Sequence, residues 1–307
     1  MQRARVGSVA LFATMTAVAF GAAACSSVTT GPAMQASAPE VLTPEEEALL
    51  GANIDSTINS ETKAAPAALQ DHFQALLDQL ANAAGADREG MVLSVKVLDV
   101  PETGNVFATP SGSIYITSGV LLSAADEAEV AALLAHELGH VVKRHPTARL
   151  VRGLGREQLK ALAVSQSKIA RDQQLASALT SATYALMTGG AQLRYLPEEE
   201  TAADARALSY LDHEGFDKGA LGTFLCAPSK TTPSPLAVLH AAHPLSLDRL
   251  ATMPPRASRK RPHATPGLVA LKGMVSDQKA ENKRLAKKAA SKSSAEQPTL
   301  DKASARQ

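Results

Sequence analysis

The feature that most constrains the fold of this 307-residue chain is an apolar stretch, residues 130–142, that carries two histidines four positions apart. Its sequence, VAALLAHELGHVV, predicts a buried helix. On a helix, residues four apart lie on one face, so His136 and His140 can direct their imidazoles at one point. Glu137 follows His136 directly. Two imidazoles and a carboxylate in this spacing predict a zinc site.

The same spacing predicts hydrolytic chemistry. Zinc lowers the pKa of its bound water towards about 7, and a neighbouring carboxylate can take the water's proton as the water attacks a peptide carbonyl. We therefore expect His136 and His140 to bind Zn²⁺, one ion per chain, and Glu137 to be the catalytic base. The alternative is a chance occurrence in which both histidines are ordinary core residues.

A third metal ligand is expected outside this helix, because a catalytic zinc usually has three protein ligands and one open position. Residues 196–208, LPEEETAADARAL, place three glutamates at a predicted helix start. Glu200 and Asp204 share a face, so we expect Glu200 to bind the metal and Asp204 to orient a ligand imidazole. The alternative is that these acids only interact favourably with the N-terminal end of the helix dipole, which is our interpretation of Glu198 and Glu199.

The rest of the sequence predicts an α+β fold that is mostly helical. Aromatic residues make up only 3% of the chain and Trp is absent, so the core must consist mainly of Ala, Leu and Val. Alternating, β-branched segments before the apolar stretch predict three strands, over 91–100, 105–109 and 113–117. Helices are expected from an N-cap at Thr43 and over 66–84, 125–143, 156–187, 198–212, 218–225 and 245–253.

The first 24 residues have the three parts of an export signal, ending in the small residues Ala22–Ala24. Cys25 follows and resembles the lipidated cysteine of a bacterial lipoprotein, with Ser26 favouring the outer membrane. We expect an exported protein anchored in a membrane through a lipid on Cys25 and facing the periplasm. A soluble periplasmic or secreted protein, or an uncleaved anchor over 6–24, are the alternatives.

Charge and composition predict four parts: the signal peptide 1–24, a flexible tether 25–42, a folded domain 43–255 and a basic, disordered tail 256–307. The tail holds 13 Lys and Arg against 4 Asp and Glu, whereas the rest holds 18 against 26. No nucleic-acid partner is therefore expected for the folded part. Cys226 lies in an apolar segment and is expected to be a small buried residue, so no disulfide framework is predicted.

Several motifs together resemble metallopeptidase family forty-eight, the HtpX-like and CAAX-prenyl-protease-like gluzincins. The resemblance starts with HELGH followed by Glu200 and Asp204. The segment 105–122, NVFATPSGSIYITSGVLL, is similar to the strand–turn–strand before the zinc helix of that family. His243-Pro244, with Arg249 six residues after the histidine, is similar to its downstream element.

The resemblance covers about residues 43–253 and implies a zincin-like metallopeptidase domain. It further implies endopeptidase action on unfolded or misassembled proteins of the cell envelope. The transmembrane helices of the HtpX branch are missing, which places the chain with exported, lipoprotein-like members. One departure is Leu196-Pro197, where the family often has Ser-Arg; Pro197 suits a first helical turn.

The motifs leave the roles of His243 and Arg249 open. His243 is expected either as an additional zinc ligand in a resting state or as a group that stabilises the oxyanion, against a capping or core role. Arg249 is expected to pair with Asp204, with Glu200 or with a substrate carbonyl, against a surface role. The remaining histidines receive no site role: His72, His145, His213, His240 and His263.

Polypeptide substrates are expected to pair with an edge strand at 105–109 through main-chain hydrogen bonds. The alternative is that 105–109 is an ordinary interior strand. The competing function is a holdase or assembly factor that binds polypeptide without cutting it. A third possibility is a tethered wall-binding module that works through the basic tail.

Overall fold

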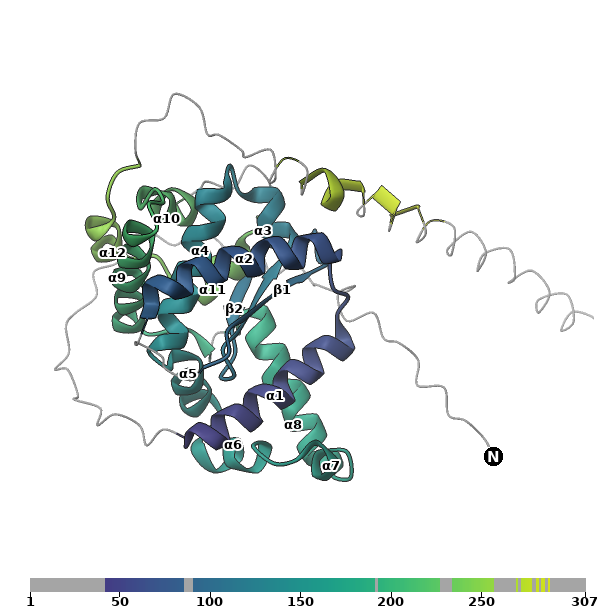
Figure 1. The fold of residues 1–307 in the computed structure, drawn as a ribbon. Helices are drawn as coiled ribbons and strands as arrows, with labels where there is room; N and C mark the ends of the chain where they lie inside the picture. The colour runs from purple at the N-terminus through teal and green to yellow at the C-terminus, as the bar shows by residue number, and fades with distance from the viewer. Residues whose placement is uncertain are drawn as a thin grey trace, which may run out of the picture. The chain divides into compact units, whose positions relative to one another are not determined.

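The computed structural model describes residues 42–85, 91–190, 193–226 and 234–256, and residues 269, 272–277, 280, 281, 283, 284 and 287. Within this part the chain forms a mostly helical α+β domain around a three-stranded sheet, which confirms the predicted fold class (Figure 1). No described helix has the length and apolar character needed to cross a membrane. The predicted signal peptide, Cys25 and nearly all of the tether lie outside the described residues, so the predicted division of the chain stays a prediction.

The elements follow one another along the chain as α1 Pro44–Glu61, α2 Ala67–Ala84, β1 Ser94–Leu98, β2 Val106–Ala108, β3 Ser113–Thr117, α3 Ser118–Ser123, α4 Glu127–Val142, α5 His145–Leu154, α6 Arg156–Leu162, α7 Gln166–Ile169, α8 Gln173–Thr188, α9 Pro197–His213, α10 Gly219–Leu225, α11 Ala237–Ala242 and α12 Leu247–Thr252. α1 begins at the predicted cap: the Thr43 hydroxyl accepts from the Glu46 N–H, and the Glu46 carboxylate accepts from the Thr43 N–H.

The sheet has the strand order β1-β3-β2. β1 runs parallel to β3, and β2 runs antiparallel to it with Phe107 opposite Tyr115. β2 therefore forms an edge of the sheet, as predicted for residues 105–109. The edge is nevertheless covered: Val106, Phe107 and Ala108 are all buried, and the Asn105 side chain donates to the Met187 carbonyl oxygen of α8 at 2.7 Å.

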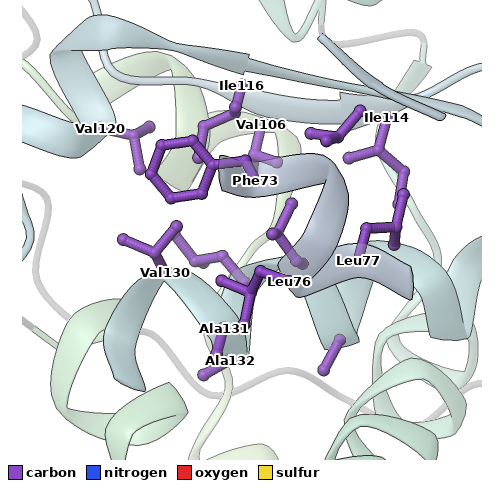
Figure 2. Close-up of a cluster of buried hydrophobic side chains, with 14 of the residues drawn as sticks. Phe73, Leu76, Leu77, Val106, Ile114, Ile116, Val120, Val130, Ala131 and Ala132 are labelled. Carbon is purple, nitrogen blue, oxygen red and sulfur yellow. The ribbon is translucent and has the colours of Figure 1, made fainter. Parts of the chain in front are cut away.

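The two faces of the sheet contribute to separate hydrophobic clusters because successive strand residues point to opposite sides. Ile114 and Ile116 face α2 and α4, as Figure 2 shows. Phe107 and Tyr115 stack at 5.2 Å on the other face, in the cluster that includes α1 and α8. The first cluster is built on Phe73, Leu76, Leu77, Val106, Ile114, Ile116, Val120, Val130, Ala131 and Ala132.

α4 and α9 pack closely, and the contact depends on Gly139. A Cβ atom at this position would lie 2.8 Å from the Ala203 carbonyl oxygen of α9. Only glycine permits this approach of the two backbones. The approach brings the histidines of α4 opposite the acids of α9.

The structure corrects several sequence predictions. The single helix expected over 156–187 is wrong: three helices occupy this range, and α8 starts anew where the Asp172 carboxylate accepts from two main-chain N–H groups. α3, α5 and α11 were not predicted. Cys226 is exposed, contrary to the expectation that it is buried. Val275, from the predicted tail, is buried in the first cluster, so this part of the tail packs on the domain.

Candidate metal centre

Four potential metal ligands converge between α4, α9 and the segment after α11. They are His136, His140, Glu200 and His243, all buried, with ligand atoms within 4.8 Å of one another. The two histidines come from one face of α4, and Glu200 comes from the first turn of α9, which starts at Pro197 as predicted. His243 follows the short helix α11.

The spacing of these ligand atoms fits zinc. The Nε2 atom of His136 lies 3.0 Å from Nε2 of His140 and 3.2 Å from Nδ1 of His243. Glu200 places Oε1 at 3.0 Å from the His243 nitrogen and 3.6 Å from the His140 nitrogen. Four ligands at bond lengths of about 2.0–2.1 Å around a tetrahedral ion are about 3.3 Å apart. The four side chains therefore form a cage of the size that zinc requires.

Asp204 and Arg249 hold two members of this cage. The Asp204 carboxylate lies 2.9 Å from Nδ1 of His136, which leaves Nε2 of that ring facing the other ligands. Arg249 donates to both Asp204 oxygens, at 2.6 and 2.8 Å, and its Nη1 lies 2.5 Å from Glu200. The predicted pairing of Arg249 with an acid thus involves both Asp204 and Glu200. Carboxylates that orient ligand imidazoles are a common feature of zinc sites.

His145, which received no site role from the sequence, contacts the His140 ring. Its Nδ1 lies 2.9 Å from Nδ1 of His140. His145 reaches this place because the preceding residue, Arg144, turns the chain with a positive φ of 58°. The Arg144 side chain is fixed by Glu47, at 3.0 Å from both carboxylate oxygens, and by the Leu42 carbonyl oxygen at 2.7 Å. A positive φ at a non-glycine residue is uncommon, and nothing in the sequence pattern around Arg144 predicts it.

Tyr195 and Arg149 also line the centre without having been predicted. The Tyr195 ring stacks on the His140 imidazole with a centroid distance of 3.7 Å and an angle of 11°. The Arg149 guanidinium lies over the same phenol ring, with Cζ 4.2 Å from its centroid. Both side chains are buried. Neither belongs to the motifs that point to zinc, so sequence spacing gave no reason to select them.

Glu137 faces the cage from α4. Its Oε1 lies 3.2 Å from Nε2 of His243, and the carboxylate is fully buried. Burial raises the pKa of Glu137, and the positive charges of His243, His136 and Arg149 oppose this increase. The carboxylate is therefore placed beside the potential ligands, where a base acting on metal-bound water must be.

The electrostatics of the metal-free site prepare Glu200 and His140 for cation binding, whereas His136 must first lose a proton. Burial would raise the pKa of Glu200, but the charge of His243 and the hydrogen bonds of three imidazoles lower it well below its ordinary value. Burial lowers the pKa of His140 well below its ordinary value, which keeps that ring neutral. Burial would also lower the pKa of His136, but Asp204 and Glu200 raise it to about 10. An ionised carboxylate and a neutral imidazole are the forms that bind zinc.

A His-Glu-x-x-His helix that packs against a second helix bearing a glutamate defines a zincin-like metallopeptidase. The comparison of sequences agrees, because the profile of Peptidase family M48 matches residues 67–257, more than half of the chain. The chain belongs to this family, whose members are zinc metallopeptidases, and the resemblance inferred from the motifs is confirmed.

Curated relatives are named as beta-barrel assembly-enhancing proteases and as a metalloprotease. The chain is 30% identical over 170 residues to the beta-barrel assembly-enhancing protease of Yersinia pestis, covering 52% of this chain and 34% of that protein. It is 29% identical over 168 residues to the protein of that name in Escherichia coli K12. It is 25% identical over 189 residues to Metalloprotease LoiP of the same organism, with 62% and 72% covered. The chain spans about a third of the length of the beta-barrel assembly-enhancing proteases that it matches.

Proposed function

We propose that this chain is a zinc-dependent endopeptidase of the cell envelope that cleaves unfolded or misassembled polypeptides. The observation that supports it most strongly is the four-ligand cage with Glu137 beside it. His136, His140 and Glu200 would hold the zinc ion, with Asp204 and Arg249 orienting the ligands. The names of the beta-barrel assembly-enhancing relatives support a substrate in the envelope.

The residues of the chain have distinct tasks in this reaction. A bound zinc ion supplies Lewis acidity and an activated water. Glu137 takes the proton of that water and passes it to the leaving amine. His243 lies between Glu137 and Glu200, at 3.2 and 3.0 Å. It can complete the cage in a resting protein, or donate to the oxyanion once its ring leaves the cage; the distances support the first role for the arrangement seen here.

The polypeptide would bind beside the edge strand β2. In an antiparallel pair, outward and inward main-chain groups alternate along an edge strand. The Thr117 N–H donates to the Asn105 carbonyl oxygen, and the Thr109 N–H donates to the Ser113 carbonyl oxygen. Residues 105 and 109 of the β2 segment therefore point their main-chain groups towards β3. Ala108 lies one residue from Thr109, so its main-chain groups point away from β3. Pairing through these groups uses no side chains and suits substrates of diverse sequence. Because β2 is buried, the segments that cover it must move before a peptide can pair.

We further propose export and a lipid anchor on Cys25, at the outer membrane and facing the periplasm. The support is the order of basic, apolar and small residues before Cys25. Replacing Cys25 with Ser should move the mature protein from the membrane fraction to the soluble fraction. Recovery of both forms in the membrane fraction after a high-salt wash would contradict the lipid anchor.

The central test combines metal content and proteolysis of casein, an unfolded protein. The mature protein should contain one zinc per chain and cleave casein, and a chelator should stop cleavage. Glu137→Gln should retain zinc and lose cleavage, because it removes the base and leaves the ligands in place. Casein that binds equally to the wild type, to Glu137→Gln and to the chelated protein, without being cut, would establish a holdase instead.

A further inference from the structure

Arg149 on α5 is a buried cation whose charge acts on Glu137 without an ion pair between them. It is 1% exposed, and in the described part of the chain its guanidinium forms no ion pair with a carboxylate. Its Nε has no hydrogen-bond partner there either. Arg249, which is equally buried, contrasts with it by pairing with two carboxylates. A buried charge that makes no ion pair is costly, so its presence beside the candidate metal centre calls for an explanation.

A second unpartnered donor lies beside it. The hydroxyl of Tyr195, a residue that is 2% exposed, has no hydrogen-bond partner among the described residues. The His140 imidazole covers one face of the Tyr195 ring, so the Arg149 guanidinium lies over the other face. The guanidinium can only donate hydrogen bonds, and the phenol can donate one. The pair is therefore suited to an oxygen acceptor that the protein itself does not provide.

The position of the pair indicates which acceptor. The Arg149 Nη2 atom lies 3.4 Å from the Ala108 carbonyl oxygen, a long hydrogen bond at the outward edge of β2. On its other side, the pair adjoins His140 through the Tyr195 ring. The donors thus lie between the edge strand and the predicted metal ligands. An extended peptide on this edge would carry its own carbonyl groups past them.

We propose that Arg149 and Tyr195 form a subsite that binds a main-chain carbonyl oxygen of the substrate next to β2. The peptide would bring an N–H group to the Ala108 oxygen, which Arg149 now contacts, and a carbonyl oxygen to the freed guanidinium. A charge-assisted bond to a guanidinium is stronger than a neutral one. This inference rests on the proposed pairing of the substrate with β2. Within that pairing, Arg149 and Tyr195 position the peptide for cleavage.

The binding test uses zinc-loaded mature protein carrying Glu137→Gln and a fluorescent casein peptide that the wild type cleaves. In this background Arg149→Met should raise the dissociation constant roughly tenfold to a hundredfold, the effect of losing a hydrogen bond to a charged group. Tyr195→Phe should raise it less, and the double variant should raise it by less than the product of the single effects. Arg171→Met and Tyr184→Phe change exposed residues and are the matched controls.

Kinetics and stability separate a binding role from a structural one. In active protein, Arg149→Met should raise KM more than it lowers kcat, because the carbonyl is bound in the ground state and in the transition state alike. Its thermal midpoint should stay unchanged or rise, since the substitution removes an unpaired buried charge. A fall in the midpoint with unchanged KM would overturn the subsite. Tyr195→Phe removes only a hydroxyl, so an unchanged dissociation constant in that folded variant would also overturn it.

Failure of this inference can be told apart from failure of the proposed protease. If neither substitution changes casein cleavage, the proposed subsite is wrong, and the proposed protease activity is unaffected. If the zinc-loaded wild type does not cleave casein, the proposed protease activity is wrong. If Arg149→Met affects only peptides with a free carboxyl terminus next to the cleaved bond, the acceptor is a terminal carboxylate, and the assignment to a main-chain carbonyl is wrong.

Discussion

The Nδ1 atoms of His140 and His145 lie 2.9 Å apart, so one ring donates a hydrogen bond and the other accepts it. When His140 donates, its Nε2 is left free to face the other potential ligands. His145 is thus a positioning residue that acts through His140. We expect His145→Ala to weaken zinc binding roughly tenfold to a hundredfold, as loss of such partners does in other zinc sites. Competition with a chelator of known affinity measures this.

The matched variant is His145→Asn, whose side-chain oxygen can take the place of the accepting nitrogen. Zinc affinity should recover in this variant to near the wild-type value. Equal zinc affinity in wild type and His145→Ala would show that the contact has no part in holding the ligand.

Zinc affinity should depend on pH because His136 must lose a proton to bind metal. Asp204 and Glu200 raise its pKa to about 10 against the effect of burial. Affinity should therefore increase between pH 6 and pH 8, by about tenfold per unit for each proton released. Calorimetry in two buffers of different ionisation enthalpy counts these protons.

The raised pKa of His136 has the opposite effect on the stability of the metal-free protein, which should fall as the pH rises. Protonated His136 stabilises the metal-free fold below its ordinary pKa of 6.5, and this contribution is lost as the pH rises towards about 10. Asp204→Asn should lower the pKa of His136 and flatten both dependences. A zinc affinity that is constant from pH 6 to pH 8 would contradict the assigned protonation.

Removing Arg249 should destabilise the domain strongly. The variant Arg249→Met leaves the buried carboxylates of Asp204 and Glu200 without their guanidinium, at a cost of about 3–5 kcal/mol. Urea unfolding of the metal-free protein measures this loss. Arg284→Met removes an exposed arginine that pairs with Glu281 and should leave the unfolding midpoint unchanged. Similar midpoints for the two variants would mean that the Arg249 network contributes nothing to stability.

Gly139→Ala tests the close contact of α4 with α9. The added Cβ would meet the Ala203 backbone, so the helices must separate, at a cost of about 1–3 kcal/mol. Zinc affinity should fall as well, because the ligands lie on both helices. Gly273→Ala, where an added Cβ meets nothing, is the control for the substitution itself. Unchanged stability and zinc affinity in Gly139→Ala would contradict the role of this contact.

Local patterns in the sequence were sufficient for much of this fold. The cap at Thr43, the three strands and the starts of α2 and α9 follow from turn chemistry, alternation and a first-turn proline. The break into α6, α7 and α8 was missed because Ala and Leu are compatible with one continuous helix, and the cap at Asp172 has no strong flanking signal. Helix propensity does not reveal where tertiary packing ends a helix.

The residues of the candidate site also fall into a group that local sequence patterns predict and a group that they do not. His136, His140, Glu200 and Asp204 could be selected because helical spacing fixes which residues share a face, and Glu137 because it directly follows His136 in the motif. His145, Arg149 and Tyr195 could not, because their positions depend on the turn at Arg144 and on the approach of the segment before α9. Contacts between elements set these positions, and no spacing within one element encodes them.

The stacking of Tyr195 on His140 gives the protein a built-in optical probe. The chain contains four tyrosines and no tryptophan, so phenol emission is not masked by indole. A phenol that touches one potential ligand should change its emission when the metal enters. Titration of zinc into a variant whose other tyrosines are phenylalanine would then report site occupancy directly, without a label.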